Sequence, residues 1–285
     1  TVHRLHAKVV SKIQETPSAC TLELQAGAAF EGLQPGQYVT IAVVINGVRH
    51  RRAYSPRSLD GAVDRFAITV QRQPDGKVSN HVHDHVSVGD VIEIEQAAGD
   101  FTLPAKAPTE LLLIAGGSGI TPCMSMLQHL RRTHTTTRVT LVYFARSEAD
   151  RIFAKPLAQM AQAWEQFTYV PLESSANTAQ HNADLTVLDA ALLDRSAPHW
   201  RMVPAYCCGP APLMDAARTL WSESATVGRL KLEAFGAAKP SGDPNVRHKI
   251  TLKRGNEELA FEAPATETVL VAGEQAGFAI KHGCR

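Results

Sequence analysis

The sequence predicts a β plus α/β protein, with an antiparallel β-barrel over residues 1–105 and a doubly wound parallel sheet over residues 106–236. Two observations support this prediction. The first part contains short segments of alternating apolar and polar residues separated by turn-forming residues, as in small antiparallel barrels. The second part alternates apolar runs with amphipathic segments, as in parallel sheets whose strands are joined by helices. Residues 237–247 follow as a linker, and residues 248–285 form a small third segment.

In the predicted barrel, apolar and polar residues alternate at residues 20–24, 66–70 and 91–95. Such alternation is typical of strands with one face buried. Asn46-Gly47 is a strong signal for a two-residue hairpin turn. We expect only one short helix in this part, near residues 79–85.

The predicted parallel sheet takes its elements from a regular strand–helix repeat. Its expected strands are residues 111–115, 139–144, 167–172, 205–207 and 230–234. Its expected helices are residues 121–132, 153–162, 187–193 and 212–221. Because ligands of such sheets lie beyond the carboxyl ends of the strands, we expect the site there.

A glycine-rich turn follows the first apolar run of this sheet. Residues 111–115 are typical of a strand buried on both faces, and the turn contains Gly116, Gly117 and Gly119. A helix starting at Thr121 would direct its N-terminal N–H groups toward the turn, which favours a phosphate ligand. The spacing differs from G-x-G-x-x-G, so a tight strand–helix connection is the alternative interpretation.

Composition places few further limits on function. The chain has 285 residues, of which 44% are hydrophobic and 20% charged, as in a globular protein of about two domains. A formal net charge of +1 does not indicate a nucleic-acid partner, and no apolar run is long enough to cross a membrane. The five cysteines are irregularly spaced, which argues against a disulfide framework and favours the cytoplasm.

Two polar clusters stand out in the predicted barrel. Strand alternation puts Arg52 and Tyr54 on one face, where a guanidinium suits a phosphate and a ring suits stacking, and Ser55 adds a hydroxyl. Gly76 and Ser79 precede the short helix, where a serine cap and free N–H groups would form a second anion site. Taken singly, these residues are equally typical of ordinary structural roles: Arg52 of a surface arginine, Tyr54 of a core tyrosine and Ser79 of a helix cap.

Together these motifs resemble the ferredoxin–NADP reductase superfamily, in the order in which that family carries them. The flavin-side motifs are Arg52-x-Tyr54-Ser55-x-x-Ser58 and Gly76-x-x-Ser79. The nucleotide-side motifs are the turn at residues 116–122, Cys208-Gly209-Pro210 and Glu233-Ala234-Phe235. The resemblance covers most of residues 1–236 and implies an NAD(P)H-dependent flavin oxidoreductase.

For the flavin, the resemblance implies that Arg52 neutralises a pyrophosphate together with the backbone N–H groups of Lys77, Val78 and Ser79. Tyr54 would flank the isoalloxazine ring, and Ser55 would bond the nitrogen that accepts the hydride. Because both phosphate motifs are present, the resemblance favours FAD over FMN.

For the nucleotide, the resemblance places Thr121 at the helix start near the nicotinamide and Cys208 near the reacting carbon, flanked by Gly209 and Pro210. Glu233 would polarise the nicotinamide pocket, and Phe235 would cover the flavin. Ser55, Cys208 and Glu233 are the residues nearest the chemistry.

The choice between NADPH and NADH depends on the end of the second parallel strand. Arg146, Ser147 and Arg151 favour the 2′-phosphate of NADPH, whereas Glu148 and Asp150 argue for NADH. We expect NADPH.

The end of the sequence resembles the start of a plant-type [2Fe–2S] loop. Cys284 matches its first ligand, but C-x₄-C-x₂-C needs cysteines that this sequence lacks. Residues 248–285 are too few for a core of their own, so we expect a partial ferredoxin-like domain of a longer chain.

The order of the three parts resembles reductases that supply oxygenases, hydroxylases and desaturases with electrons. The alternatives are a flavohaemoglobin-like reductase and a non-catalytic electron-transfer or redox-sensing subunit. His81 and His85, one helical turn apart, invite a metal, but the phosphate site is the better interpretation of that stretch.

Overall fold

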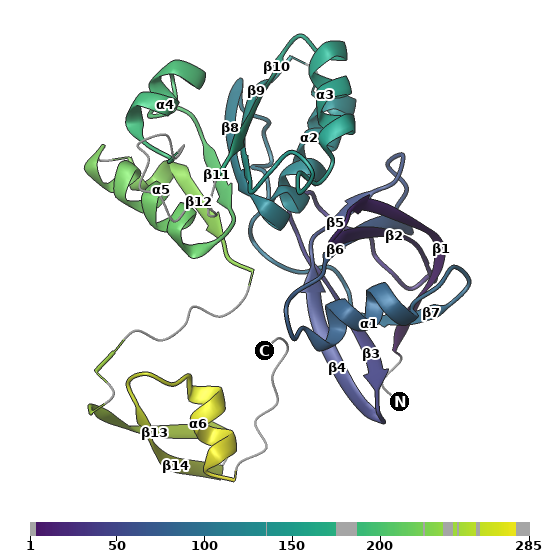
Figure 1. Cartoon of the computed structure of the whole chain (residues 1–285), viewed down its shortest axis with the longest axis vertical. Helices are drawn as coiled ribbons and strands as arrows, with labels where there is room; N and C mark the ends of the chain where they lie inside the picture. The colour runs from purple at the N-terminus through teal and green to yellow at the C-terminus, as the bar shows by residue number, and fades with distance from the viewer. Residues whose placement is uncertain are drawn as a thin grey trace. The chain divides into compact units, whose positions relative to one another are not determined.

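The computed structural model describes residues 4–134, 136–174, 187–224, 226–235, 242–243, 245–254 and 257–277. The chain forms two compact units, Thr1–Phe235 and Gly236–Arg285. The first contains both a curled antiparallel sheet and a parallel sheet flanked by helices (Figure 1).

The antiparallel sheet has seven strands in the order β4-β3-β7-β1-β2-β6-β5, and every pair is antiparallel. The strands are β1 (Leu5–Thr16), β2 (Ala19–Ala26), β3 (Val39–Ile45), β4 (Val48–Tyr54), β5 (Pro56–Ser58), β6 (Arg65–Gln71) and β7 (Val91–Ile94). Its core is made of the inward residues of the predicted alternating segments, among them Leu22, Leu24, Phe66 and Ile68. In the described part the edge strands β4 and β5 do not pair, so the sheet curls without the closure that the sequence predicted.

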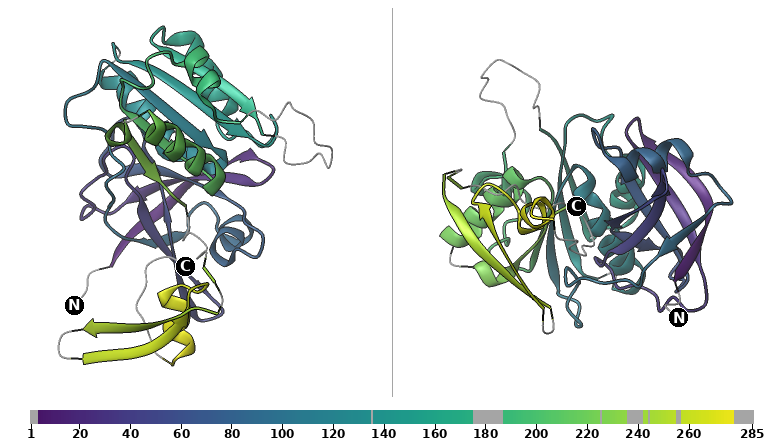
Figure 2. Two further views of the ribbon diagram at one scale, coloured as in Figure 1. Left: turned by 90° about the vertical axis from the view of Figure 1, so that its left-hand side faces the viewer. Right: turned by 90° about the horizontal axis from the view of Figure 1, so that it is seen from below.

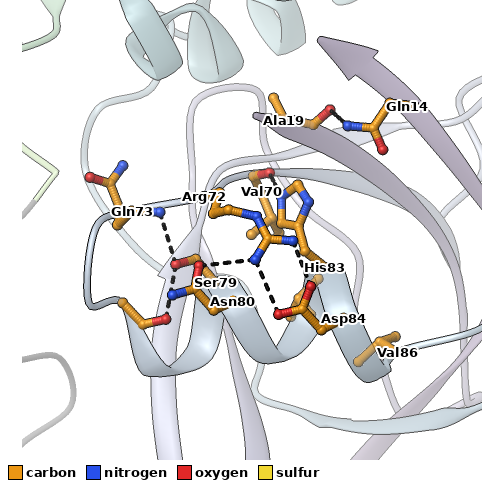
Figure 3. A network of polar contacts seen from close by, with 12 residues as sticks. Gln14, Ala19, Val70, Arg72, Gln73, Ser79, Asn80, His83, Asp84 and Val86 are labelled. Carbon is orange, nitrogen blue, oxygen red and sulfur yellow. Dashed lines mark hydrogen bonds and ion pairs between the residues drawn. The ribbon is translucent and has the colours of Figure 1, made fainter. Parts of the chain in front are cut away.

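One short helix, α1 (Lys77–His85), packs on this sheet, and it is the helix that the sequence predicted. Val78 and Val82 are buried in the core of the sheet. Arg72 and His83 hold α1 in place, because Arg72 Nη2 lies 2.7 Å from Asp84 Oδ1 and His83 Nε2 lies 2.9 Å from the carbonyl oxygen of Val70 (Figure 3).

The parallel sheet has the order β10-β9-β8-β11-β12 and confirms the predicted doubly wound fold. Its strands are β8 (Glu110–Gly116), β9 (Arg138–Ala145), β10 (Phe167–Glu173), β11 (Ala205–Cys208) and β12 (Leu230–Glu233). Short 3₁₀ turns are η1 (Gly117–Gly119) and η2 (Val227–Arg229). The helices are α2 (Ile120–Thr133), α3 (Ala154–Ala163), α4 (Ala190–Ser196) and α5 (Ala211–Glu223).

These helices cover both faces of the parallel sheet (Figure 2). Leu113 and Tyr143 pack with α2 and α3 in one core, whereas Leu112 and Ile114 pack with α4 and α5 in the other. Helix α4 begins at Ala190, later than the predicted residue 187. The reason is that the Asp189 carboxylate accepts a hydrogen bond from the N–H of Leu192 at 2.7 Å and caps the helix there.

The two sheets of the first unit are joined by close packing. Helix α2 lies against β5, and the hydroxyl of Tyr206 donates to the carbonyl oxygen of Thr102 at 2.9 Å in the connecting segment. The turn after β8 lies near the end of β6, because a Cβ on Gly117 would be 3.9 Å from Gln71 Oε1. This packing puts the carboxyl ends of the parallel strands next to the antiparallel sheet.

The second unit contains the antiparallel pair β13 (Arg247–Arg254) and β14 (Glu257–Pro264) and the helix α6 (Val269–Gln275). Its small core is formed by Phe261, Ala263 and Ala272. Cys284 lies outside the described residues. In the part of the chain that the structure describes, none of the helices is long and apolar enough to span a membrane.

Candidate active site

The glycine turn after β8 is packed backbone to backbone against the loop after β11. A Cβ on Gly119 would lie 2.1 Å from the carbonyl oxygen of Cys208, and one on Gly116 would lie 2.7 Å from Pro210 Cδ. Gly209 is equally close, with 3.0 Å between its notional Cβ and the nitrogen of Gly116. Side chains at these positions would collide with the neighbouring loop, so the three glycines allow the two loops to pack together at the N-terminus of α2.

Helix α2 starts one residue earlier than predicted, with Gly119 at the cap position. Thr121 therefore lies inside the first turn and does not start the helix as the sequence suggested. Its buried hydroxyl donates to the carbonyl oxygen of Ser118 at 3.0 Å. The 3₁₀ turn η1 leads directly into the helix, and no side chain in the described structure caps it.

Cys208 and Glu233 are neighbours at the carboxyl edge of the sheet. They are register partners in the β11–β12 pair, and Cys208 is also paired with Ala115 of β8. Cys208 is fully buried, and burial raises the pKa of its thiol well above the ordinary value. The thiol is therefore protonated and is suited to packing, not to nucleophilic attack.

The carboxylate of Glu233 has an unusual environment. Its Oε2 atom is buried without a hydrogen-bond partner, and burial raises the pKa of Glu233 to about 7. Such a buried, unsatisfied carboxyl group is rare unless a ligand completes it. Phe235, two residues further, is half exposed beyond the end of β12.

On the antiparallel sheet, the predicted flavin residues lie at the end of edge strand β4. Arg52 and Tyr54 are half-buried, and Arg52 Nη1 donates to the carbonyl oxygen of Arg51 at 2.7 Å. Ser55 is only 4% exposed, and its Oγ has no hydrogen-bond partner in the described structure. Ser58 differs, because its hydroxyl already donates to the carbonyl oxygen of Ala62 at 2.9 Å.

The second predicted anion site is the N-terminus of α1. Gly76 is the cap residue, so the first-turn N–H groups belong to Lys77, Val78 and Ser79. Ser79 is thus not the cap that the sequence suggested. Its Oγ accepts from the N–H of Gln73 at 3.2 Å and donates to the carbonyl oxygen of Gly76 at 3.3 Å (Figure 3).

A side chain at position 76 would not fit this turn, because its Cβ would lie 2.4 Å from Ser79 Oγ. Gly76 and Ser79 therefore shape the turn together. The rings of His81 and His85 contact each other one turn apart in a tilted arrangement, with centroids 5.1 Å from each other. Within the described residues, no group of three or more His, Cys, Asp or Glu side chains could hold a metal ion.

At the end of β9, the predicted specificity residues separate into two environments. Arg146 Nη2 lies 3.1 Å from Asp150 Oδ1, and Ser147 Oγ donates to Asp150 Oδ2 at 2.9 Å, so the three form one cluster. The side chain of Arg151 is instead only 10% exposed, and its Nη2 lies 3.8 Å from Glu173 Oε1. Arg146 and Ser147 are therefore the accessible pair, and Asp150 partly neutralises the charge of Arg146.

Sequence reasoning missed Tyr143, whose ring is buried in the core beneath the glycine turn. Its hydroxyl donates to the carbonyl oxygen of Gly117 and accepts from the N–H of Ile152, each at 3.1 Å. A tyrosine within an apolar strand was the available signal, because a buried phenol needs a partner.

Comparison with known proteins agrees with this geometry. Residues 6–103 match the model of the oxidoreductase FAD-binding domain, and residues 113–219 match that of the oxidoreductase NAD-binding domain. An NADPH oxidoreductase of Mycobacterium tuberculosis is 32% identical over 99% of this chain and 72% of its own length. The chain belongs to the ferredoxin–NADP reductase superfamily.

Two further members of the superfamily differ in how far the similarity extends. The structure of phthalate dioxygenase reductase, described as a modular structure for electron transfer from pyridine nucleotides to [2Fe–2S], is 27% identical with a TM-score of 0.70. That match covers 99% of this chain and 83% of the other. A flavohemoprotein of Halalkalibacterium halodurans is 34% identical, but over 81% of this chain and 59% of its own length.

The family assignment confirms an FAD- and pyridine-nucleotide-binding oxidoreductase of the ferredoxin reductase type. It also confirms the predicted succession of a curled antiparallel sheet and a parallel sheet with helices.

Proposed function

We propose that the protein passes a hydride from NADPH to FAD and then single electrons, through a [2Fe–2S] centre, to an oxygenase, hydroxylase or desaturase. The observation that carries the proposal is that two of the buried polar atoms without a partner in the described structure belong to the predicted site residues, one in each half of the first unit. These atoms are Ser55 Oγ beside the flavin motif and Glu233 Oε2 at the edge of the parallel sheet. Because folded proteins rarely leave such atoms unsatisfied, a cofactor and a substrate are their natural partners.

The flavin half fits FAD. Arg52 and the N–H groups of Lys77, Val78 and Ser79 would hold the pyrophosphate, Tyr54 would flank the ring, and Ser55 would donate to a ring nitrogen. Bound there, FAD would accept the hydride and release its two electrons one at a time. Ser58 contributes by holding the turn after β5, since its hydroxyl is bonded within that turn.

The nucleotide half fits a dinucleotide across the carboxyl edge of the sheet. The backbone at Gly116, Gly117 and Gly119 would bind the pyrophosphate, helped by the first turn of α2 with Thr121. The loop after β11, formed by Cys208, Gly209 and Pro210, would orient the nicotinamide. Glu233 would polarise the pocket on the nicotinamide side. Phe235 would cover the flavin in the absence of nucleotide.

Arg146 and Ser147 support NADPH as the preferred donor. Both are placed at the end of β9, where the ribose of the adenosine half binds in sheets of this kind. Arg151 supports the same segment from inside, against Glu173. The name of the mycobacterial relative agrees with this preference.

The electron acceptor is proposed from the extent of the similarity. The matches to the NADPH oxidoreductase and to phthalate dioxygenase reductase cover 99% of this chain, whereas the flavohemoprotein match covers 81%. The residues 236–285 thus favour an oxygenase-type reductase over a flavohaemoglobin-like one. Cys284, as the first ligand of a [2Fe–2S] loop, belongs to this proposal and lies outside the described residues.

The proposal is tested by mixing the purified protein with NADPH without oxygen. We expect flavin absorbance to bleach within seconds and ferricyanide to be reduced with turnover. Chromatography of the heat-released flavin should show FAD. A yellow protein that neither NADPH nor NADH bleaches would instead be a non-catalytic subunit, and release of FMN alone would remove the phosphate-binding role of α1.

A further inference from the structure

The hydroxyl of Tyr143 connects two loops of the nucleotide half that are far apart in sequence. Tyr143 lies on β9 beside Ala115 of β8, with its side chain fully buried. The hydroxyl donates to the carbonyl oxygen of Gly117 at 3.1 Å and accepts from the N–H of Ile152 at 3.1 Å. One phenol therefore links the glycine turn to the segment that leads into α3.

The bond to Gly117 helps to hold the orientation of a peptide group of the turn. Gly117 has a φ of +52°, and its carbonyl oxygen also accepts from the N–H of Ile120. In a trans peptide the carbonyl and the next N–H point in opposite directions. Because the carbonyl of Gly117 points inward to Tyr143, the N–H of Ser118 points away from Tyr143, toward the proposed pyrophosphate site.

The bond to Ile152 holds a strained segment. Phe153, the next residue, has a φ of +59°, a left-handed conformation that is rare for a bulky side chain. Its ring is buried, and the guanidinium carbon of Arg57, from β5, lies 5.8 Å from the ring centroid. This segment directly follows the cluster of Arg146, Ser147 and Asp150.

We propose that Tyr143 is a positioning residue that sets the spacing between the pyrophosphate turn and the ribose-binding end of β9. It acts through backbone groups and does not touch the nucleotide. Losing the hydroxyl removes one of the two hydrogen bonds that hold the Gly117 carbonyl and leaves the N–H of Ile152 without this acceptor, so both segments are held less firmly. The inference rests on the proposed binding of a dinucleotide at this turn.

The test is Tyr143→Phe in the full chain with FAD bound, which removes one oxygen and keeps the ring. Tyr206→Phe is the matched control, because Tyr206 is also a buried tyrosine packed in the same core. Its hydroxyl donates to a backbone oxygen away from the turn, that of Thr102. The nucleotide dissociation constant and the limiting rate of flavin reduction are measured by anaerobic stopped-flow with NADPH.

For Tyr143→Phe we expect a dissociation constant raised about five- to tenfold, because losing both hydrogen bonds of the hydroxyl loosens the turn that binds the nucleotide, with FAD content and dithionite reduction unchanged. Amide hydrogen exchange should become faster at residues 117–120 and 151–154. Tyr206→Phe should leave both measurements unchanged. The inference is overturned if Tyr143→Phe binds and reacts like the wild type, or if Tyr206→Phe is impaired equally.

These outcomes are distinct from failure of the proposed function. A wild type that neither NADPH nor NADH reduces would refute the reductase proposal itself. A wild type that is reduced, with an unaffected Tyr143→Phe variant, would refute only the positioning role.

Discussion

Arg146 and Asp150 lie four residues apart in the turn that follows β9, with Arg146 Nη2 3.1 Å from Asp150 Oδ1. Asp150 also accepts a hydrogen bond from the hydroxyl of Ser147, so one carboxylate binds both side chains. A 2′-phosphate would compete with Asp150 for these two donors.

We expect Arg146→Ala to raise the Michaelis constant for NADPH about ten- to a hundredfold and to leave that for NADH nearly unchanged, since a charge-assisted bond is lost. Asp150→Asn should lower the constant for NADPH, because it frees both donors and removes a negative charge. Arg138→Ala is the control. Arg138 is similarly exposed and ion-paired, with Glu110, but lies at the opposite end of β9. Equal use of both nucleotides by the wild type would contradict this prediction.

Glu233 makes stability depend on pH in a defined direction. Burial raises its pKa to about 7, above the ordinary value of 4.5, so the native state binds the proton more tightly than the unfolded state. Stability should then fall as pH rises from about 4.5 to about 7 through this group. Glu233→Gln should therefore raise the melting temperature at pH 8 and change it little at pH 5.

Glu93→Gln is the matched comparison, because it should change the melting temperature at pH 8 in the opposite direction. A hydrogen bond from Arg49 holds the pKa of Glu93 below its ordinary value, so the ionised carboxylate stabilises the fold at neutral and alkaline pH. This substitution should lower the melting temperature at pH 8, where Glu233→Gln raises it. Parallel shifts of the two variants at pH 8 would argue against the assigned cause.

Gly119 should tolerate no side chain. In Gly119→Ala the new Cβ would lie 2.1 Å from the carbonyl oxygen of Cys208, which is backbone and cannot yield without moving β11. We expect a loss of about 3 kcal/mol in the free energy of unfolding, at the upper end for overpacking, and weaker nucleotide binding. Urea denaturation measures the first effect. Gly228→Ala, which has open space around it, should stay close to the wild type.

The buried cysteines should be inert in the native protein. Cys20, Cys123, Cys207 and Cys208 are all buried, and burial raises the pKa of each thiol. Since the thiolate is the reactive form, a Cys284→Ser variant should show no thiol reacting with Ellman's reagent within minutes. In denaturant the same variant should show all four. Rapid modification of the native variant would contradict the burial of these side chains.

Local patterns in the sequence determined the succession of the two sheets, the short helix near residue 80 and the glycine turn as the organising feature. Alternation in residues 20–24 and the apolar run at residues 111–115 depend on which face of a strand is buried, and that information is local. The same holds for the motif residues Arg52, Ser55, Cys208 and Glu233, because their spacing is set by single strands and turns.

Only the tertiary structure decided how those residues meet. Gly119 contacts the loop of Cys208 because β8 and β11 are neighbours in the sheet, although about ninety residues separate them along the chain. The burial that leaves Ser55 Oγ and Glu233 Oε2 without partners, and the hydrogen bonds that join Tyr143 to Gly117 and Ile152, likewise depend on strand order and register. No local pattern encodes these contacts, because register and packing are settled by the whole fold at once.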